Sequence, residues 1–148
     1  MATIDKTRSG PLLGKIPFDG LNKCYVMKNI VDLTGGPIVD NDIYQCLPIP
    51  ANTLVMQVRL KMITPAVGTS LAMDIGDAGN NSWDDAVDGK GAAGVITRSL
   101  VGTDAYAAAA TMGKEYEAAD SIDVTMEAAV AITAGPKFEV SALCVDFN

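Results

Sequence analysis

From Lys23 onward, apolar and polar residues alternate along most of the chain, and this pattern predicts β-strands. Residues 53–63 show it most clearly. By the two-residue period, one face of this segment carries Leu54, Met56, Val58, Leu60 and Met62. The opposite face carries Gln57, Arg59 and Lys61. We therefore expect a strand with one side in the core and the other in water, as in an antiparallel sheet.

The same pattern recurs in short segments separated by turn residues. The segments are residues 23–33, 43–50, 69–75, 94–101, 121–128, 129–133 and 137–147. Pro48 and Pro50 place the end of the second segment at a sheet edge or just outside the ladder. Residues 104–113 fit either a short helix capped by Asp104 or an extended segment. About eight strands with frequent turns predict an all-β fold, an antiparallel β-sandwich or jelly roll.

An acidic stretch, residues 73–89, is the strongest candidate for a metal-binding site. It contains Asp74, Asp77, Asp84, Asp85 and Asp88. Calcium sites draw six to eight oxygens from such residues. The EF-hand spacing fails, because counted from Asp77 the third position is Gly79 and the twelfth is Asp88 in place of glutamate. We interpret the stretch as a loop in which Asp74 points outward, Ser82 caps a single turn and Trp83 covers one end of the sandwich. An irregular metal site remains the alternative.

The first part of the chain lacks a helix or strand period. We expect an extended N-terminal arm over residues 1–20 and a β-sandwich domain over residues 21–148. The arm carries four large apolar residues: Leu12, Leu13, Ile16 and Phe18. It could lie over its own domain or extend onto a neighbouring subunit, and in the second case these four residues would make the contact.

Charge and composition exclude several functional classes. The net charge is −7, which argues against nucleic-acid binding. The apolar runs are too short or too interrupted to cross a membrane, and no signal peptide is recognisable. Three widely spaced cysteines fit a protein made in the reducing cytoplasm. Because histidine is absent and the GKGAAG segment, residues 89–94, lacks the Walker spacing, we assign no catalytic residue, cofactor or metal.

The order of three segments resembles a known group of proteins. These are GTSLAMDIGD, then WDDAVDG, then the C-terminal run from Tyr116 to Asn148. Together they resemble small virion proteins of tailed bacteriophages, notably capsid decoration (cement) proteins of the cyanophage kind. The resemblance covers residues 53–148 and implies a β-sandwich that forms homo-oligomers, often trimers, on the outside of the phage head. The implied partner is the major capsid protein, and the implied location is the virion surface after synthesis in the host cytoplasm.

Two other functions remain open from the sequence. One is a tail or head-fibre component, which belongs to the same structural class. The other is a calcium-dependent carbohydrate-binding module built on the acidic stretch. The eight aromatic residues in the chain are few for a sugar-binding groove.

Overall fold

The computed structural model describes residues 3–5, 23–77, 83–99 and 113–146, and its regular elements are all β-strands. In chain order they are β1 (Thr3–Asp5), β2 (Lys23–Asp32), β3 (Ile43–Ile49), β4 (Thr53–Thr64), β5 (Ser70–Gly76), β6 (Asp84–Asp88), β7 (Ile96–Ser99), β8 (Lys114–Tyr116), β9 (Asp120–Val130) and β10 (Lys137–Asp146). The predicted all-β class is confirmed. In the described part of the chain, no helix has the length and hydrophobicity needed to span a bilayer.

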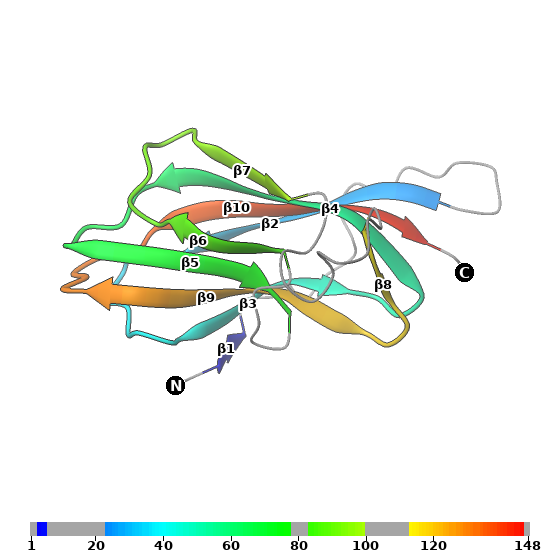
Figure 1. Cartoon of the computed structure of the whole chain (residues 1–148), viewed down its shortest axis with the longest axis horizontal. Helices are drawn as coiled ribbons and strands as arrows, with labels where there is room; N and C mark the ends of the chain where they lie inside the picture. The colour runs from blue at the N-terminus through cyan, green and yellow to red at the C-terminus, as the bar shows by residue number, and fades with distance from the viewer. Residues whose placement is uncertain (1–2, 6–22, 78–82, 100–112, 147–148) are drawn as a thin grey trace.

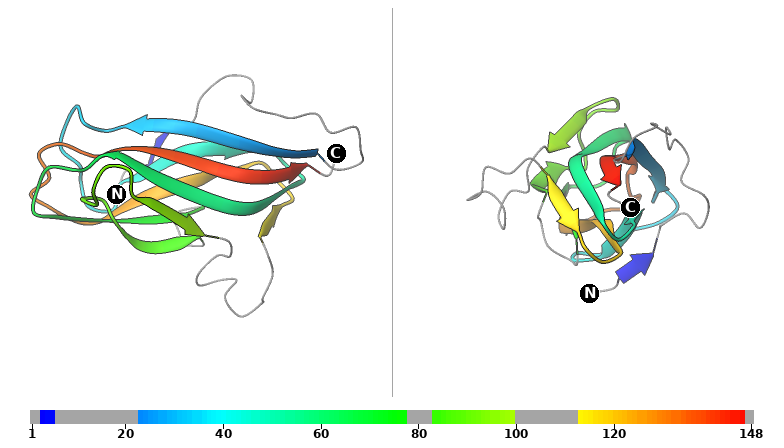
Figure 2. Two further views of the ribbon diagram at one scale, coloured as in Figure 1. Left: turned by 90° about the horizontal axis from the view of Figure 1, so that it is seen from above. Right: turned by 90° about the vertical axis from the view of Figure 1, so that its right-hand side faces the viewer.

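The strands form two facing sheets (Figure 1). Sheet one has the order β1-β3-β9-β5-β6, and sheet two has the order β2-β10-β4-β7, with β8 pairing beside β4. If the three-residue strands β1 and β8 are set aside, two four-stranded sheets remain whose order is that of a jelly roll. All pairings are antiparallel except that between β1 and β3. Figure 2 shows the sheets enclosing the interior, with β1 at the periphery.

The core fills the space between the sheets with aliphatic, sulfur-containing and aromatic side chains. Phe138, Val140, Ala142 and Cys144 alternate along β10 and are each 0% exposed. Ile122, Val124 and Met126 do the same on β9. A side-chain hydrogen bond also joins the sheets, because Asn29 Nδ2 on β2 donates to the Cys46 carbonyl on β3 at 2.8 Å. A register shift against β9 occurs between Gln45 and Leu47, and Cys46 is the residue that it skips.

The prediction for residues 53–63 is correct for half of the strand. Val58, Leu60 and Met62 are buried as expected, but Val55 replaces Leu54 and Met56 as the inward residue of the first half. The cause is a register shift against β10, where Leu143 pairs with Gln57 and Cys144 pairs with Val55. A bulge inserts one residue and moves the following side chains to the other face.

Two further expectations are corrected. Residues 84–88 form strand β6 and not a capped turn, and Lys114–Tyr116 form a strand that the sequence did not indicate. Within the predicted arm, Thr3–Asp5 form β1, which pairs with the first half of β3. Ser82, most of residues 104–113 and the four apolar arm residues lie outside the described residues.

Candidate functional site: a buried polar clamp and an apolar loop end

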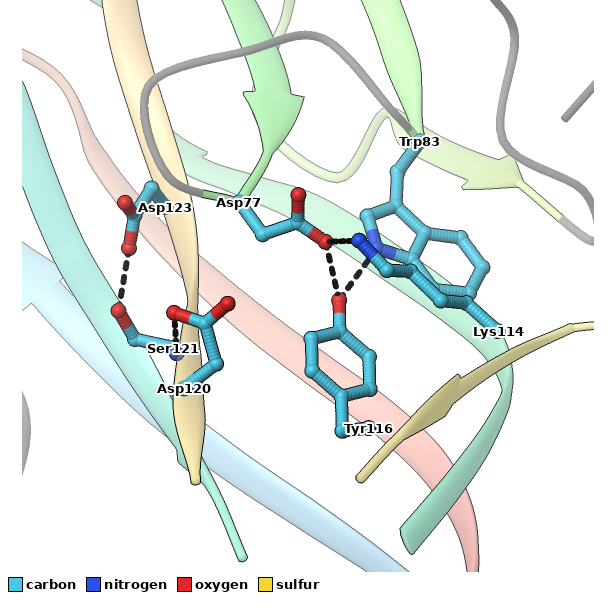
Figure 3. A network of polar contacts seen from close by, with 7 residues as sticks. All are labelled: Asp77, Trp83, Lys114, Tyr116, Asp120, Ser121 and Asp123. Atoms are coloured by element: carbon cyan, nitrogen blue, oxygen red, sulfur yellow. Dashed lines mark hydrogen bonds and ion pairs between the residues drawn. The ribbon is translucent and has the colours of Figure 1, made fainter. Parts of the chain in front are cut away.

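Two features of the fold are candidates for function. The first is a polar network of Asp77, Trp83, Lys114 and Tyr116, here called the polar clamp (Figure 3). The Tyr116 hydroxyl donates to Asp77 Oδ2 at 2.6 Å and accepts from Trp83 Nε1 at 3.2 Å. Lys114 Nζ forms an ion pair with the same Asp77 oxygen and lies 5.0 Å from the centre of the Tyr116 ring. The Asp77, Trp83 and Tyr116 side chains are almost completely buried.

The local chain path explains how these residues meet. Asp77 directly follows β5, and Trp83 directly precedes β6, where its backbone N–H donates to the Ile75 carbonyl at 2.9 Å. Lys114 and Tyr116 lie on β8, which pairs with the start of β4 in the other sheet. Gly113 has a φ of +96° and approaches the Val55 carbonyl so closely that a side chain there would clash. The clamp therefore joins the edge of sheet one to sheet two.

The polar clamp is suited to holding structure and unsuited to nucleophilic chemistry at neutral pH. Burial, together with the hydrogen bond to Asp77, raises the pKa of the Tyr116 hydroxyl above its ordinary value.

Outside the clamp, burial likewise raises the pKa of the Cys46 thiol, and it raises the pKa of the Cys144 thiol to about 12. Protonated hydroxyls and thiols are weak nucleophiles. Trp83 is buried, with an exposed fraction of 0%, and its position over one end of the sandwich stays a prediction.

The rest of the acidic stretch makes internal hydrogen bonds. Asp74 lies on the outer face of β5 as predicted but is only 6% exposed, and its Oδ1 accepts from the Ala86 backbone N–H at 2.8 Å. Asp88 Oδ1 accepts from the Lys90 backbone N–H at 2.8 Å. Within residues 3–5, 23–77, 83–99 and 113–146, no group of three acidic or cysteine side chains is arranged to hold a metal ion. Asp74 and Asp88 therefore serve as hydrogen-bond acceptors within and beside the β5–β6 hairpin.

A second polar group lies near the clamp on β9 (Figure 3). The Ser121 hydroxyl donates to Asp123 Oδ1 at 2.6 Å, and the Ser121 backbone N–H donates to Asp120 Oδ1 at 2.8 Å. Asp123 is 4% exposed. A serine whose hydroxyl donates directly to a buried carboxylate is fixed in place, with no histidine in the chain to activate it.

The GKGAAG segment is anchored by its lysine. Lys90 Nζ donates to the carbonyls of Gly68, at 2.5 Å, and Thr69, at 3.0 Å. Gly91 N–H donates to the Asp88 carbonyl at 3.1 Å. These contacts direct the ammonium group to the backbone of a neighbouring loop, which is unlike a phosphate-binding loop.

The second candidate feature is an apolar loop end. Four exposed valines lie in or beside the β2–β3, β4–β5, β6–β7 and β9–β10 loops. These loops lie toward the left in Figure 1. They are Val39, Val67, Val95 and Val130, with exposed fractions of 63%, 59%, 50% and 50%. Ile96, at the start of β7, is exposed beside Val95. Exposed apolar side chains gathered in one region indicate an interaction surface.

Backbone hydrogen bonds connect the loops that carry these valines. Val67 N–H donates to the Ala134 carbonyl at 2.9 Å, and Thr69 N–H donates to the Val130 carbonyl at 3.0 Å. Leu33 N–H donates to the Pro136 carbonyl at 3.1 Å, and Ala66 N–H donates to the Gly89 carbonyl at 3.0 Å. The apolar loop end is therefore preorganised, which reduces the entropy lost when a partner binds.

Sequence reasoning identified only part of these features. It singled out Asp77 and Trp83 but missed Lys114 and Tyr116, which follow them by more than thirty residues. It did not connect the four valines, because they come from four separate segments of the chain. The predicted contact residues Leu12, Leu13, Ile16 and Phe18 lie outside the described residues.

Comparison with known proteins relates the chain to phage capsids through structure. By sequence, no family model and no curated protein matches it. A chain in the capsid of Ralstonia phage GP4 superposes with a TM-score of 0.65 at 18% identity, covering 98% of each chain. A chain of the cyanophage Pam1 capsid has a TM-score of 0.62 at 18% identity, covering 95% of this chain and 98% of that one.

A third match comes from the acid-stable capsid of the Helicobacter pylori bacteriophage KHP30. It has a TM-score of 0.55 at 16% identity and covers 84% of this chain and 89% of that one. At these identities the likeness establishes the fold alone. The protein is therefore an all-β chain with the fold of proteins found in three bacteriophage capsids.

Proposed function

We propose that this protein is a virion structural protein of a tailed bacteriophage that decorates the outside of the head. The observation that carries the proposal is the end-to-end match to a chain of the GP4 capsid, which covers 98% of both chains. That neighbour is therefore about as long as this protein, and nearly all of it superposes on this one chain. The other two matches also come from phage capsids.

The proposed partner is the major capsid protein, bound at junctions between its subunits. A protein that binds only the assembled shell stabilises that shell by mass action, and several linked contacts increase the apparent affinity. A homotrimer would supply such multivalency, because cyclic oligomers present identical surfaces to a symmetric lattice.

The apolar loop end is suited to such a contact. Its valines are exposed, and the hydrogen-bonded loops hold them in place without a partner. Four exposed acidic residues, Asp32, Asp40, Asp88 and Glu127, lie in the same region. The cations that the structure describes there are Lys90 and Lys137, and Lys137 pairs with Asp32 at 2.9 Å, so the region has an excess of negative charge. Two copies of this acidic end would repel each other, so we assign it to a different protein, an apolar capsid surface with basic residues at its rim. The arm residues Leu12, Leu13, Ile16 and Phe18 are proposed as additional contacts.

The test is co-sedimentation of the purified protein with phage heads that lack it. We expect saturable binding to heads and none to isolated tails. Deletion of residues 2–19 should abolish binding while the domain remains folded, and replacing the four arm residues by serine should weaken it with β1 still present. Full binding by the truncated protein would exclude the arm as a contact.

A paired substitution tests the apolar loop end. Val67→Ser with Val130→Ser should reduce capsid binding at least about tenfold, as expected when central apolar contacts are lost. The matched control is Val26→Ser with Ile30→Ser, which alters two exposed β-branched side chains on the outer face of β2. Equal losses for both pairs would refute the assignment of this end.

The alternative of a tail or head-fibre component predicts binding to tails in the same assay. The alternative of a calcium-dependent carbohydrate-binding module receives less support. Asp74 and Asp77 already accept hydrogen bonds from within the protein, and the described residues contain no cluster of metal ligands.

A further inference from the structure

Strand β1 is attached to the sandwich along one edge only. It runs parallel to β3, with Thr3 opposite Ile43, Ile4 opposite Tyr44 and Asp5 opposite Gln45. It is the outermost strand of sheet one, and β3 is its paired neighbour. On its other side, β3 pairs with β9 from Ile43 to Ile49, with Cys46 skipped at the register shift. The sheet therefore retains its jelly-roll strands whether or not β1 is in place.

The sequence of β3 limits how far this pairing extends. The ladder to β1 ends at Gln45, where β3 also has its register shift against β9. Two residues beyond Cys46 lies Pro48, which has no N–H to donate to a further strand. A ladder of three residues is a weak attachment, because short strands are marginally stable without further packing. The backbone ladder by itself therefore contributes little free energy to holding β1 on its own domain.

The connection between β1 and the rest of the chain is long. Residues 6–22 lead from Asp5 to Lys23, the first residue of β2 in sheet two. Seventeen residues can span at most about 56–61 Å when fully extended. The longest strand, β4, has 12 residues and is therefore about 40 Å long. The connection can reach farther than the length of the sandwich, so β1 can reach the β3 edge of an adjacent molecule.

We propose that in the assembled oligomer the β1 strand of one copy pairs with the β3 edge of a second copy. Exchange of an identical element preserves every hydrogen bond of the closed arrangement, and for this reason it is a low-cost route to oligomers. Subunits held side by side give the exchanged strand an effective concentration in the millimolar range.

The proposal concerns contacts between copies of this chain and does not rest on capsid binding. Edge strands that remain open invite pairing with other chains, and an exchanged strand closes each edge within the oligomer. The β3 edge is thus assigned to the protein itself.

Disulfide trapping between two differently tagged chains tests the exchange. One chain carries Asp5→Cys and the other carries Gln45→Cys, and both carry Cys24→Ser because Cys24 is exposed. Asp5 and Gln45 are directly paired in the parallel ladder. Since each chain has one introduced cysteine, a disulfide between them can form only across copies. After co-expression and mild oxidation we expect a heterodimer band that reducing agent removes.

The matched control pairs Asp5→Cys with Lys28→Cys, an exposed position on the other sheet. It should give several-fold less heterodimer. If the Gln45 variant fails to fold, Thr3→Cys with Ile43→Cys probes the same register. A chain carrying both Asp5→Cys and Gln45→Cys measures pairing of β1 with its own domain, because its two cysteines can form a disulfide within one chain.

Two outcomes would overturn the proposal. In one, the double-cysteine chain closes only an internal disulfide and the mixed chains yield no heterodimer, so β1 stays on its own domain. In the other, neither arrangement gives a disulfide above the Lys28 control. Co-sedimentation with heads is measured separately, so failure of the exchange is distinguishable from failure of the proposed capsid function.

Discussion

Buried aspartates are the main polar feature at the scale of single residues. Asp42, Asp74, Asp77, Asp123 and Asp146 are all less than 9% exposed. Burying a carboxylate costs free energy unless hydrogen bonds or a cation replace the lost water. Asp77 forms an ion pair with Lys114 and accepts a hydrogen bond from Tyr116. Asp74 accepts a hydrogen bond from a backbone N–H, and Asp123 accepts one from the Ser121 hydroxyl. Residues that suggested a metal site from the sequence thus stabilise loops and strand ends.

Tyr116→Phe should weaken the polar clamp. The substitution removes the hydroxyl that links Asp77 to Trp83, leaving two buried polar groups with one partner fewer. We expect a loss of about 1–3 kcal/mol in the free energy of unfolding. Urea denaturation followed by the fluorescence of Trp83, the single tryptophan, would measure it. The control is Tyr44→Phe outside the clamp, and an equal loss in both variants would argue against a special role for the clamp.

Stability should fall as the pH rises above neutrality. Burial raises the pKa of Cys144 to about 12 and also raises that of Cys46, whereas unfolded thiols ionise near pH 8.5. Above that pH the unfolded chain loses protons that the folded chain retains, so the unfolded state is favoured. Tyr116 adds to this effect above about pH 10.

Urea denaturation between pH 7.5 and 10.5 would measure this slope. Each buried thiol should contribute up to about 1.4 kcal/mol per pH unit. Cys144→Ala should therefore flatten the curve, whatever its effect on stability at neutral pH. A slope that does not change in this variant would show that the thiol ionises equally well in the folded protein.

Local irregularities in pairing determine the structure at the scale of elements. The bulge in β4 reverses which side chains face inward, and register shifts also occur in β3 and β5. Ala86 in β6 has a φ of +55°, a conformation that is strained for a residue with a side chain. Its N–H is held by the Asp74 carboxylate, which stabilises the irregular β5–β6 pairing.

Ala86→Gly should therefore be tolerated or stabilising, by up to about 1 kcal/mol, because glycine adopts positive φ without strain. The matched control is Ala72→Gly on β5, opposite Asp88 in the same hairpin, which should cost about 0.5–1 kcal/mol. Thermal denaturation of the two variants would compare them. A larger loss for Ala86→Gly than for Ala72→Gly would contradict the strain argument.

The elements also show how far the sequence pattern could predict the fold. Long strands with strict alternation, such as β10, were predicted because one buried face imposes a two-residue period. Strand β6 was missed because its acidic composition has low strand propensity and its pairing depends on the Asp74 side chain. Strands β1 and β8, with three residues each, are too short to show a period.

The jelly roll as a whole carries the polar clamp and the apolar loop end at different places. Strand β8, which carries Lys114 and Tyr116 of the polar clamp, lies right of centre in Figure 1, and the loops of the apolar loop end lie toward the left. Backbone hydrogen bonds connect the valine-bearing loops to one another, so the molecule can present these loops to a partner with little rearrangement.

Chelation of metal ions should leave the whole molecule unchanged. A calcium site saturated at a hundred times its dissociation constant would stabilise the fold by about 2.7 kcal/mol, equivalent to about 5–10 °C in Tm. We expect the Tm measured in EDTA to equal that measured in calcium. A decrease of several degrees in EDTA would revive the carbohydrate-binding alternative.

The sequence by itself determined the fold class, because its strands each carry one apolar face and it shows no long helical pattern that could cover them, which leaves packing against a second sheet. It also determined what the protein lacks for common catalysis, since histidine is absent. Only the tertiary structure decided which aspartates share a hydrogen-bond network and which valines share a surface. These residues are far apart in the chain, and strand order and register, which bring them together, depend on bulges and on cross-strand contacts that no local pattern encodes.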